Sequence, residues 1–287
     1  MNMHTDRRKP PMENQRTAIH ETALAGEPLD CLIIDAHAHV QNASNVAAYT
    51  PNPYGDGLLK SMDALGIDVA CMSVLGAGDQ NSIMLDLVSE HPDRFAGFVL
   101  INPRYPDDIL PVLESCFSNP AVKGIGEVHP TSYSHDYPVT GSAYVPVWEF
   151  AHQRNLPVLI HAGPTSEANR CRPSDLGKVA AAYPGMNVLI GHAGGYDSWD
   201  MLDEAIATAR THDNVFLEIC AMGRHPGVIE YIVRKLGEDK VVFGTDAPFH
   251  DWTAEIAHIA FSKLPDRVKE KVFGLTMADL LAQGRTA

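Results

Sequence analysis

The sequence contains few cysteines, and they form no recognisable framework. They are odd in number, widely spaced and include no Cys-x-x-Cys pair. A disulfide-rich secreted domain and a zinc ribbon are therefore excluded, and the pattern fits a reducing compartment. The five are Cys31, Cys71, Cys116, Cys171 and Cys220. We expect a cytoplasmic protein.

Long apolar runs are also missing. No segment is long and apolar enough to span a bilayer, so no membrane association is expected. The start of the chain is polar, carries the basic stretch Arg7-Arg8-Lys9-Pro10-Pro11 and lacks the apolar core of a signal peptide. We expect residues 1–28 to form a disordered or loosely attached N-terminal arm and residues 29–287 to form one domain.

Basic residues are scarce relative to acidic ones. The chain has 22 Lys and Arg against 36 Asp and Glu, which gives a formal net charge of −14. Binding to nucleic acid depends on basic side chains that neutralise phosphates, so nucleic acid is not an expected partner. We expect a small-molecule substrate, and an anionic one stays open because a bound metal can outweigh the global field locally.

What the chain does contain is a regular alternation of short apolar runs with amphipathic stretches. The runs recur about every 25 to 35 residues, a spacing that suits one strand, one helix and two loops. They are Leu32–Ile34, Val69–Val74, Phe95–Ile101, Val122–Ile125, Pro157–Ile160, Val188–Ile190, Val215–Ile219 and Val241–Phe243. The expected helices between them are Leu58–Leu65, Ser82–Glu90, Asp107–Phe117, Tyr144–Arg154, Ser174–Tyr183, Trp199–Thr211, Gly227–Leu236 and Thr253–Lys263.

This alternation, in a chain of 287 residues, predicts an α/β fold of the (β/α)8 TIM barrel type. A further helix, Pro265 to about Gln283, is expected to close the chain. A doubly wound open sheet is the alternative, but no Gly-x-Gly-x-x-Gly follows the first apolar run. Oligomeric state is not readable from the sequence, although a homodimer would suit barrels of this kind, which often pair through their helices.

The stretch Asp35-Ala36-His37-Ala38-His39 directly follows the first apolar run. Side chains alternate between the faces of a strand, so we expect Asp35, His37 and His39 to point the same way. Two imidazoles one repeat apart can bind one metal ion. Asp35 is expected either to orient one of these imidazoles or to sit in a buried ion pair.

Other metal-competent side chains follow four more of the predicted strands. They are Glu127, His161, His192 and Asp246. Each has an ordinary structural explanation when taken singly, such as a satisfied polar residue, a turn residue or an ion-pair partner. The carboxyl ends of the strands of a barrel converge on one axis, however, so the set together predicts a metal site at that end.

These residues resemble the amidohydrolase superfamily, and most closely its amidohydrolase-2 branch. The resemblance rests on Asp35-Ala-His-Ala-His39, His161, Gly191-His192-Ala-Gly-Gly195 and Gly244-Thr-Asp246, and it covers roughly Leu32 to Leu281. It implies a metal-dependent barrel enzyme in which His37, His39, His161 and Asp246 hold a single metal. In mononuclear members the residue that matches His192 is usually catalytic.

Glu127 bears on the number of metals and on the reaction. Gly124-Ile125-Gly126-Glu127 resembles the strand-4 carboxylate of TatD-like and other binuclear members. The resemblance implies a second ion on Glu127, His161 and His192, and therefore two divalent ions of Zn, Fe, Mn or Ni. Decarboxylases of the branch typically lack this glutamate. We therefore expect hydrolysis of an acyl bond (amide, ester, lactone or thioester), with Asp246 as the residue that takes a proton from the attacking water.

Two other functions stay open. The first is a mononuclear decarboxylase or hydratase of the same branch, with His192 as a catalytic acid. The second is a non-catalytic barrel that keeps the metal for structure or partner binding. For substrate contacts we expect loop residues near the strand ends, each with a solvated loop residue as the alternative. These are His129, Tyr133, Arg224 and His250.

Overall fold

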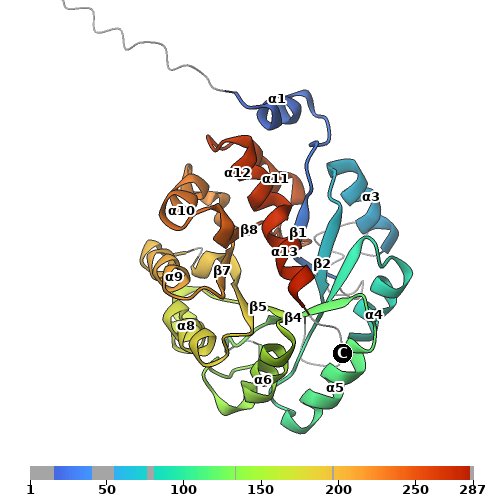
Figure 1. The fold of residues 1–287 in the computed structure, drawn as a ribbon, viewed down its shortest axis with the longest axis vertical. Coiled ribbons are helices and arrows are strands. Elements are labelled where there is room, and N and C mark those ends of the chain that lie inside the picture. Colours follow the sequence, from blue (N-terminus) through green and yellow to red (C-terminus); the bar gives the residue numbers. More distant parts are fainter. Residues whose placement is uncertain (1–15, 41–54, 76–80, 133, 196, 285–287) are drawn as a thin grey trace, which may run out of the picture.

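The structure is a computed structural model that describes residues 16–40, 55–75, 81–132, 134–195 and 197–284. Eight parallel strands lie in the order β1 to β8 (Figure 1). Backbone bonds also join the last strand region to the first: Ala36 N–H donates to Phe243 O (2.9 Å) and His39 N–H to Ala247 O (2.7 Å). The strands are β1 (Ile34–His39), β2 (Val69–Ser73), β3 (Phe95–Val99), β4 (Val122–Val128), β5 (Pro157–Ile160), β6 (Asn187–Ile190), β7 (Val215–Glu218) and β8 (Val241–Val242).

Helices other than α13 lie outside the strands, as a parallel sheet with crossover connections requires. They are α1 (Ala18–Ala25), α3 (Gly55–Leu65), α4 (Asn81–Glu90), α5 (Ile109–Phe117), α6 (Val145–Arg154), α7 (Ala168–Cys171), α8 (Pro173–Ala182), α9 (Trp199–Thr211), α10 (Val228–Leu236), α11 (Trp252–Ala260), α12 (Asp266–Glu270) and α13 (Thr276–Gln283). The π-helical stretch Lys271–Leu275 joins α12 to α13. The predicted (β/α)8 TIM barrel with an extra C-terminal helix is confirmed.

Two apolar layers hold the barrel together. One fills the inside of the strands and includes Phe98, Leu159 and Phe216, and it is completed by Met277 and Leu280 of α13. The other lies between the strands and the surrounding helices. In Figure 1, α13 crosses the middle of the barrel. Because its residues pack with those near the amino ends of the strands, the carboxyl ends remain the place for a site.

The N-terminal region differs from the expected disordered or loosely attached arm in the part that the structure describes. Residues 16–28 include α1, whose first turn is capped by Thr17 and whose Ala18 N–H donates to Asp266 Oδ2 of α12 (2.8 Å). Ile19 is buried in the core. The division into arm and domain stays a prediction for the residues before position 16. Among the described helices, none is both long and apolar enough to cross a bilayer.

Candidate metal centre

The six predicted metal ligands come together at the carboxyl ends of the strands. They are His37 and His39 in β1, Glu127 in β4, His161 just after β5, His192 just after β6 and Asp246 beyond β8. All are buried except Asp246, whose side chain is 14% exposed. His192 and Asp246 have φ values of 53° and 59°. This left-handed conformation costs non-glycine residues about 1–3 kcal/mol and is concentrated at functional sites.

One group of donors consists of His37, His39 and Asp246. The two Nε2 atoms lie 3.1 Å apart, and Asp246 Oδ1 lies 3.0 Å from His39 Nε2 and 3.7 Å from His37 Nε2. Ligands held about 2.1 Å from one ion are separated from each other by about 3.0–3.5 Å. The group therefore has the spacing and chemistry of a transition-metal site.

A second group consists of Glu127, His161 and His192. His161 Nδ1 lies 2.8 Å from Glu127 Oε1 and 3.1 Å from His192 Nε2. The other carboxylate oxygen, Oε2, lies 3.4 Å from His37 Nε2 and 3.6 Å from His39 Nε2. Glu127 thus stands between the two groups. His161 Nε2 is buried without a hydrogen-bond partner in the described part of the chain.

The charges of Asp246, Glu127 and His192 suit metal binding. Burial by itself would raise the pKa of Asp246, but the hydrogen bond with His39 and the nearby His37 outweigh it and lower that pKa to about 2. Burial likewise opposes ionisation of Glu127, yet His37 and His161 hold its pKa well below the ordinary value. Burial lowers the pKa of His192 to about 4. Anionic carboxylates and neutral imidazoles are the forms that bind metal.

Glu218 and Ser73 are among the residues that contact the metal-competent rings and were missed by the sequence analysis. Glu218 Oε2 lies 2.9 Å from His37 Nδ1, and Ser73 Oγ lies 3.0 Å from His39 Nδ1. Such outer partners orient ligating imidazoles. The sequence did offer one indication of Glu218, since it is the only charged residue in the apolar run Val215–Ile219.

Asp35 does not take either of its expected roles. The register of β1 against β2 shifts between Asp35 and Ala38, so strict alternation fails there. Asp35 accepts hydrogen bonds from the backbone N–H of His37 (3.0 Å) and Thr245 (3.0 Å), from Thr245 Oγ1 (2.6 Å) and from Trp252 Nε1 (2.6 Å). It ties β1 to the segment that carries Asp246 and, among the described residues, forms no hydrogen bond with an imidazole.

Three of the four predicted substrate contacts lie within the described residues. His129 is buried, its Nδ1 lies 2.8 Å from Thr131 Oγ1, and its ring lies 4.0 Å from that of His161. His250 Nε2 lies 3.8 Å from Asp246 Oδ2, so it borders the centre. Arg224 ends the 3-10 turn Met222–Arg224 after β7. Tyr133 lies outside the described residues. Their roles as substrate contacts stay predictions.

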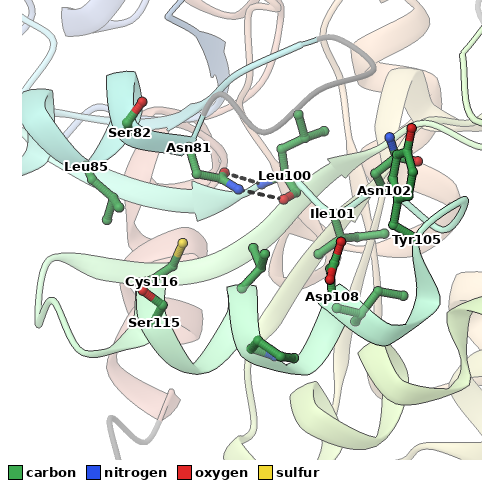
Figure 2. Close-up of a pocket in the computed structure, with 13 residues that line it drawn as sticks. Asn81, Ser82, Leu85, Leu100, Ile101, Asn102, Tyr105, Asp108, Ser115 and Cys116 are labelled. Atoms are coloured by element: carbon green, nitrogen blue, oxygen red, sulfur yellow. Dashed lines mark hydrogen bonds between the residues drawn. The ribbon is translucent and has the colours of Figure 1, made fainter.

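A separate hollow of about 430 Å³ lies beside α4 and α5 (Figure 2). Leu85, Leu100, Ile101 and Ile109 give it a largely apolar lining, and none of the six predicted ligands borders it. In the described ranges, the groups of three metal-competent side chains all lie at the strand ends instead. The candidate chemistry therefore belongs to the strand ends.

Fold and donor set together define a metal-binding barrel enzyme, and the comparisons with known proteins name its family. The amidohydrolase family profile matches residues 34–282, so the chain belongs to this family. The resemblance to the amidohydrolase-2 branch is thereby confirmed, whereas the TatD-like character of Glu127 stays a prediction. No curated protein matches the sequence.

Several solved structures share the fold at low sequence identity. An uncharacterised TIM-barrel protein from Bordetella bronchiseptica has a TM-score of 0.73 and 17% identity, over 88% of this chain and 98% of that one. A 5-carboxyvanillate decarboxylase from Sphingomonas paucimobilis gives 0.66 and 17%, over 88% and 99%. A dihydroxybenzoic acid decarboxylase from Polaromonas, with bound manganese and an inhibitor, gives 0.64 and 14%, over 88% and 96%.

These relatives correct the expected reaction. Acyl hydrolysis was inferred from Glu127, but two of the similar barrels are decarboxylases of aromatic acids. The decarboxylase alternative is therefore favoured, and the thioesterase and lactonase expectations were wrong. The physical reason is that a carboxylate beside two imidazole pairs can bind or orient a ligand without generating hydroxide. Glu127 marks the site and does not decide the chemistry.

Proposed function

We propose that this protein is a metal-dependent decarboxylase of an aromatic hydroxy acid. The observation that carries the proposal is the group His37, His39 and Asp246, which offers three donor atoms 3.0–3.7 Å apart. The group lies at the carboxyl ends of a barrel that is similar to two aromatic-acid decarboxylases. A divalent ion held there would supply positive charge for the carboxylate and a neighbouring oxygen of the substrate.

An aromatic substrate is supported by Phe249. Its ring lies 5.7 Å from the ring of His39 at an interplanar angle of 69°, and the residue is 41% exposed. An aromatic face beside a metal-competent imidazole can pack against a substrate ring while the substrate carboxylate points to the centre. His250, the next residue, borders Asp246 and is placed to contact a polar substituent.

The reaction exchanges a carboxylate for a proton on one ring carbon. The bond between that carbon and the carboxylate breaks, its electron pair stays on the ring carbon, carbon dioxide leaves and one proton is taken up. No oxidant and no hydroxide are required. We assign the proton transfer to Asp246 because it is the one predicted ligand with partial exposure to solvent, from which it can be reprotonated. An anionic substrate nearby would raise the pKa of Asp246 above its value in the free site.

The number of ions is a separate proposal. Glu127 contacts donors of both groups, with Oε1 toward His161 and Oε2 toward His37 and His39. Glu127, His161 and His192 could therefore hold a second ion beside one held by His37, His39 and Asp246. Decarboxylation itself requires only the ion of the first group. Metal analysis of purified protein should give close to two equivalents, and Glu127→Ala should reduce them. One equivalent that Glu127→Ala leaves unchanged would refute the two-ion arrangement.

The function is tested by incubating the metal-loaded protein with hydroxybenzoates that carry the carboxylate next to a hydroxyl. We expect one carbon dioxide per phenol formed, and loss of at least about 100-fold in turnover for Asp246→Asn, the size typical of a lost proton-transfer group. His91→Gln, before β3 at the opposite end of the barrel, is the matched control and should keep wild-type turnover. Hydrolysis of esters, lactones or amides without release of carbon dioxide would overturn the proposal.

A further inference from the structure

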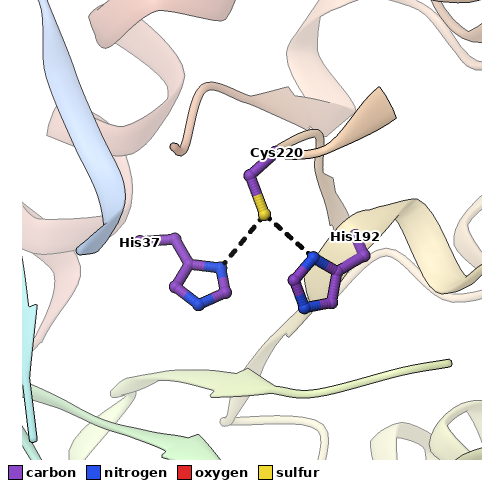
Figure 3. A group of neighbouring side chains, drawn as sticks. All are labelled: His37, His192 and Cys220. Atoms are coloured by element: carbon purple, nitrogen blue, oxygen red, sulfur yellow. Dashed lines mark hydrogen bonds between the residues drawn. The ribbon is translucent and has the colours of Figure 1, made fainter. Parts of the chain in front are cut away.

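Glu218 and Cys220 lie behind His37 and His192, on the side of the rings away from the other ligands. Figure 3 shows the Cys220 sulfur between the two rings. Sγ lies 3.0 Å from His192 Nδ1 and 3.4 Å from His37 Nδ1, and Glu218 Oε2 lies 2.9 Å from His37 Nδ1. The Nε2 atoms of both rings face the other predicted ligands instead. All four side chains are buried.

The contacts around Glu218 fix the direction of each hydrogen bond. Its carboxylate accepts from the backbone N–H of Cys220 (2.6 Å) and of His192 (3.2 Å), and from the Cys220 thiol (3.2 Å). An ionised carboxylate only accepts, so His37 Nδ1 must carry a proton. The Cys220 thiol therefore donates its proton to Glu218 Oε2, because the carboxylate has none to donate. Its sulfur is then left to accept from His192 Nδ1.

We propose that Glu218 and Cys220 are positioning residues that keep Nδ1 of His37 and His192 protonated and turn both Nε2 lone pairs toward the metal centre. Neither residue contacts the reacting atoms. Their effect is to hold each ring in one orientation and one tautomer, so that no rearrangement is needed when a metal binds. The inference rests on the metal centre of the proposed function and does not depend on the reaction being decarboxylation.

Gly244 gives independent support for a built site around Glu218. This glycine belongs to the Gly244-Thr-Asp246 segment that follows β8. A Cβ at this position would lie 2.2 Å from Glu218 Oε1 and 2.7 Å from its Cδ. Absence of a side chain at Gly244 therefore leaves the space that the Glu218 carboxylate occupies. The motif thus contributes Asp246 to the centre and room for Glu218 behind it.

The same atoms could be read as a further metal site, because His37, His192 and Cys220 offer three ligand atoms close together. The distances argue against it. Sulfur and nitrogen bound to one zinc ion at about 2.3 and 2.05 Å lie about 3.6 Å apart. The Cys220–His192 contact is 3.0 Å and Glu218 already accepts from His37 at 2.9 Å, which are hydrogen-bond lengths.

The direct test is the tautomer of each ring in metal-free wild-type protein. Two-bond nitrogen–proton correlation spectra of protein labelled with 15N histidine distinguish protonated Nδ1 from protonated Nε2. His37→Gln and His192→Gln, each recorded separately, identify the two rings by the loss of their signals. We expect both rings to be protonated at Nδ1. Finding both protonated at Nε2 would overturn the proposal without the need for any variant of Glu218 or Cys220.

Metal affinity gives the second readout, measured by competition with a chelator for Mn²⁺ and Co²⁺. Loss of an outer partner typically weakens metal binding 10- to 100-fold, so we expect this loss for Glu218→Gln and Cys220→Ala, with partial recovery in Cys220→Ser. Cys116→Ala, a buried cysteine of α5, is the matched control and should bind as wild type. Wild-type affinity in both test variants would contradict the proposal.

Cobalt also separates positioning from ligation. A thiolate-to-cobalt charge-transfer band in the loaded wild-type protein, lost in Cys220→Ser, would show that Cys220 is itself a ligand and would overturn the proposal. We expect no such band. If the protein bound no metal at all, the proposed function would fail, whereas the ring tautomers of the metal-free protein would still test the roles of Glu218 and Cys220.

Discussion

Replacement of Gly244 by alanine is a sharp perturbation, because the three atoms nearest to the added Cβ all belong to Glu218. The new Cβ would lie 2.2 Å from Glu218 Oε1, well inside van der Waals contact. Gly244 is not among the glycines with positive φ, so the effect is one of space rather than of backbone conformation. Both residues lie at the carboxyl ends of the strands, where Glu218 is fully buried.

The expected cost has two parts. Overpacking of a well-packed interior costs about 1–3 kcal/mol. If Glu218 moves away, its hydrogen bond with His37, which involves a charged group, is lost as well, at about 1.5–3 kcal/mol. The two costs do not add fully, because movement of Glu218 relieves the overlap with the new Cβ. We therefore expect the free energy of unfolding of Gly244→Ala to fall by about 2–4 kcal/mol, and its metal affinity to fall 10- to 100-fold.

Urea denaturation of the metal-free protein and chelator competition measure the two effects. Gly284→Ala is the matched control, because the nearest atom to its added Cβ lies at an ordinary 3.4 Å. In the double variant Gly244→Ala with Glu218→Ala, the alanine no longer meets a carboxylate, so the two losses should not add. Wild-type stability and affinity in Gly244→Ala, or full additivity in the double variant, would refute the steric reasoning.

Two further predictions concern stability. Burial lowers the pKa of His129 from the ordinary 6.5 to about 3 in the folded protein. The neutral ring therefore costs the fold nothing above pH 6.5, whereas protonation of the unfolded chain lowers the free energy of unfolding as the pH falls below 6.5. Between pH 6.5 and 5, urea denaturation should show a loss of unfolding free energy that is about 2 kcal/mol smaller in His129→Gln than in wild type. Asp35→Ala should lower the free energy of unfolding by about 3 kcal/mol or more, because buried donors of His37, Thr245 and Trp252 lose their acceptor; equal urea midpoints would contradict this.

The fold was predictable because the apolar runs recur at a similar spacing and each strand of the structure lies on or beside one of them. Strand bounds were less accurate. The apolar run Leu32–Ile34 overlaps only the start of the first strand, which is found at Ile34–His39 and ends at the His-x-His motif as expected. Helix α1 was missed, since a short helix near the end of the chain is stabilised by a distant partner, Asp266, that local sequence does not reveal.

The centre was predictable to the extent that it follows from strand ends alone. His37, His39 and Asp246 come together because the barrel brings the carboxyl ends of its strands to one place. Asp35 was misjudged because the register shift in β1 breaks the alternation on which its orientation was inferred. Glu218 was missed because its role depends on a ring that is 181 residues away in the sequence.

The reaction could not be read from the ligand types. Imidazoles and carboxylates in this arrangement suit hydrolysis as well as decarboxylation, and Glu127 was given more weight than its position supports. What separates the two reactions is the binding of the substrate ring and carboxylate. We expect part of that binding to fall on loop residues, and of these Tyr133 lies outside the described residues.

The most direct test of the proposed reaction is to run it in D₂O and to locate the deuterium in the product. Decarboxylation of a hydroxybenzoate by the metal-loaded protein should place one deuterium on the ring carbon that lost the carboxylate, with one carbon dioxide released per product. Proton magnetic resonance reads the position and mass spectrometry the count. Hydroxybenzoates left unchanged by loaded protein that hydrolyses an ester, lactone or amide would contradict the account.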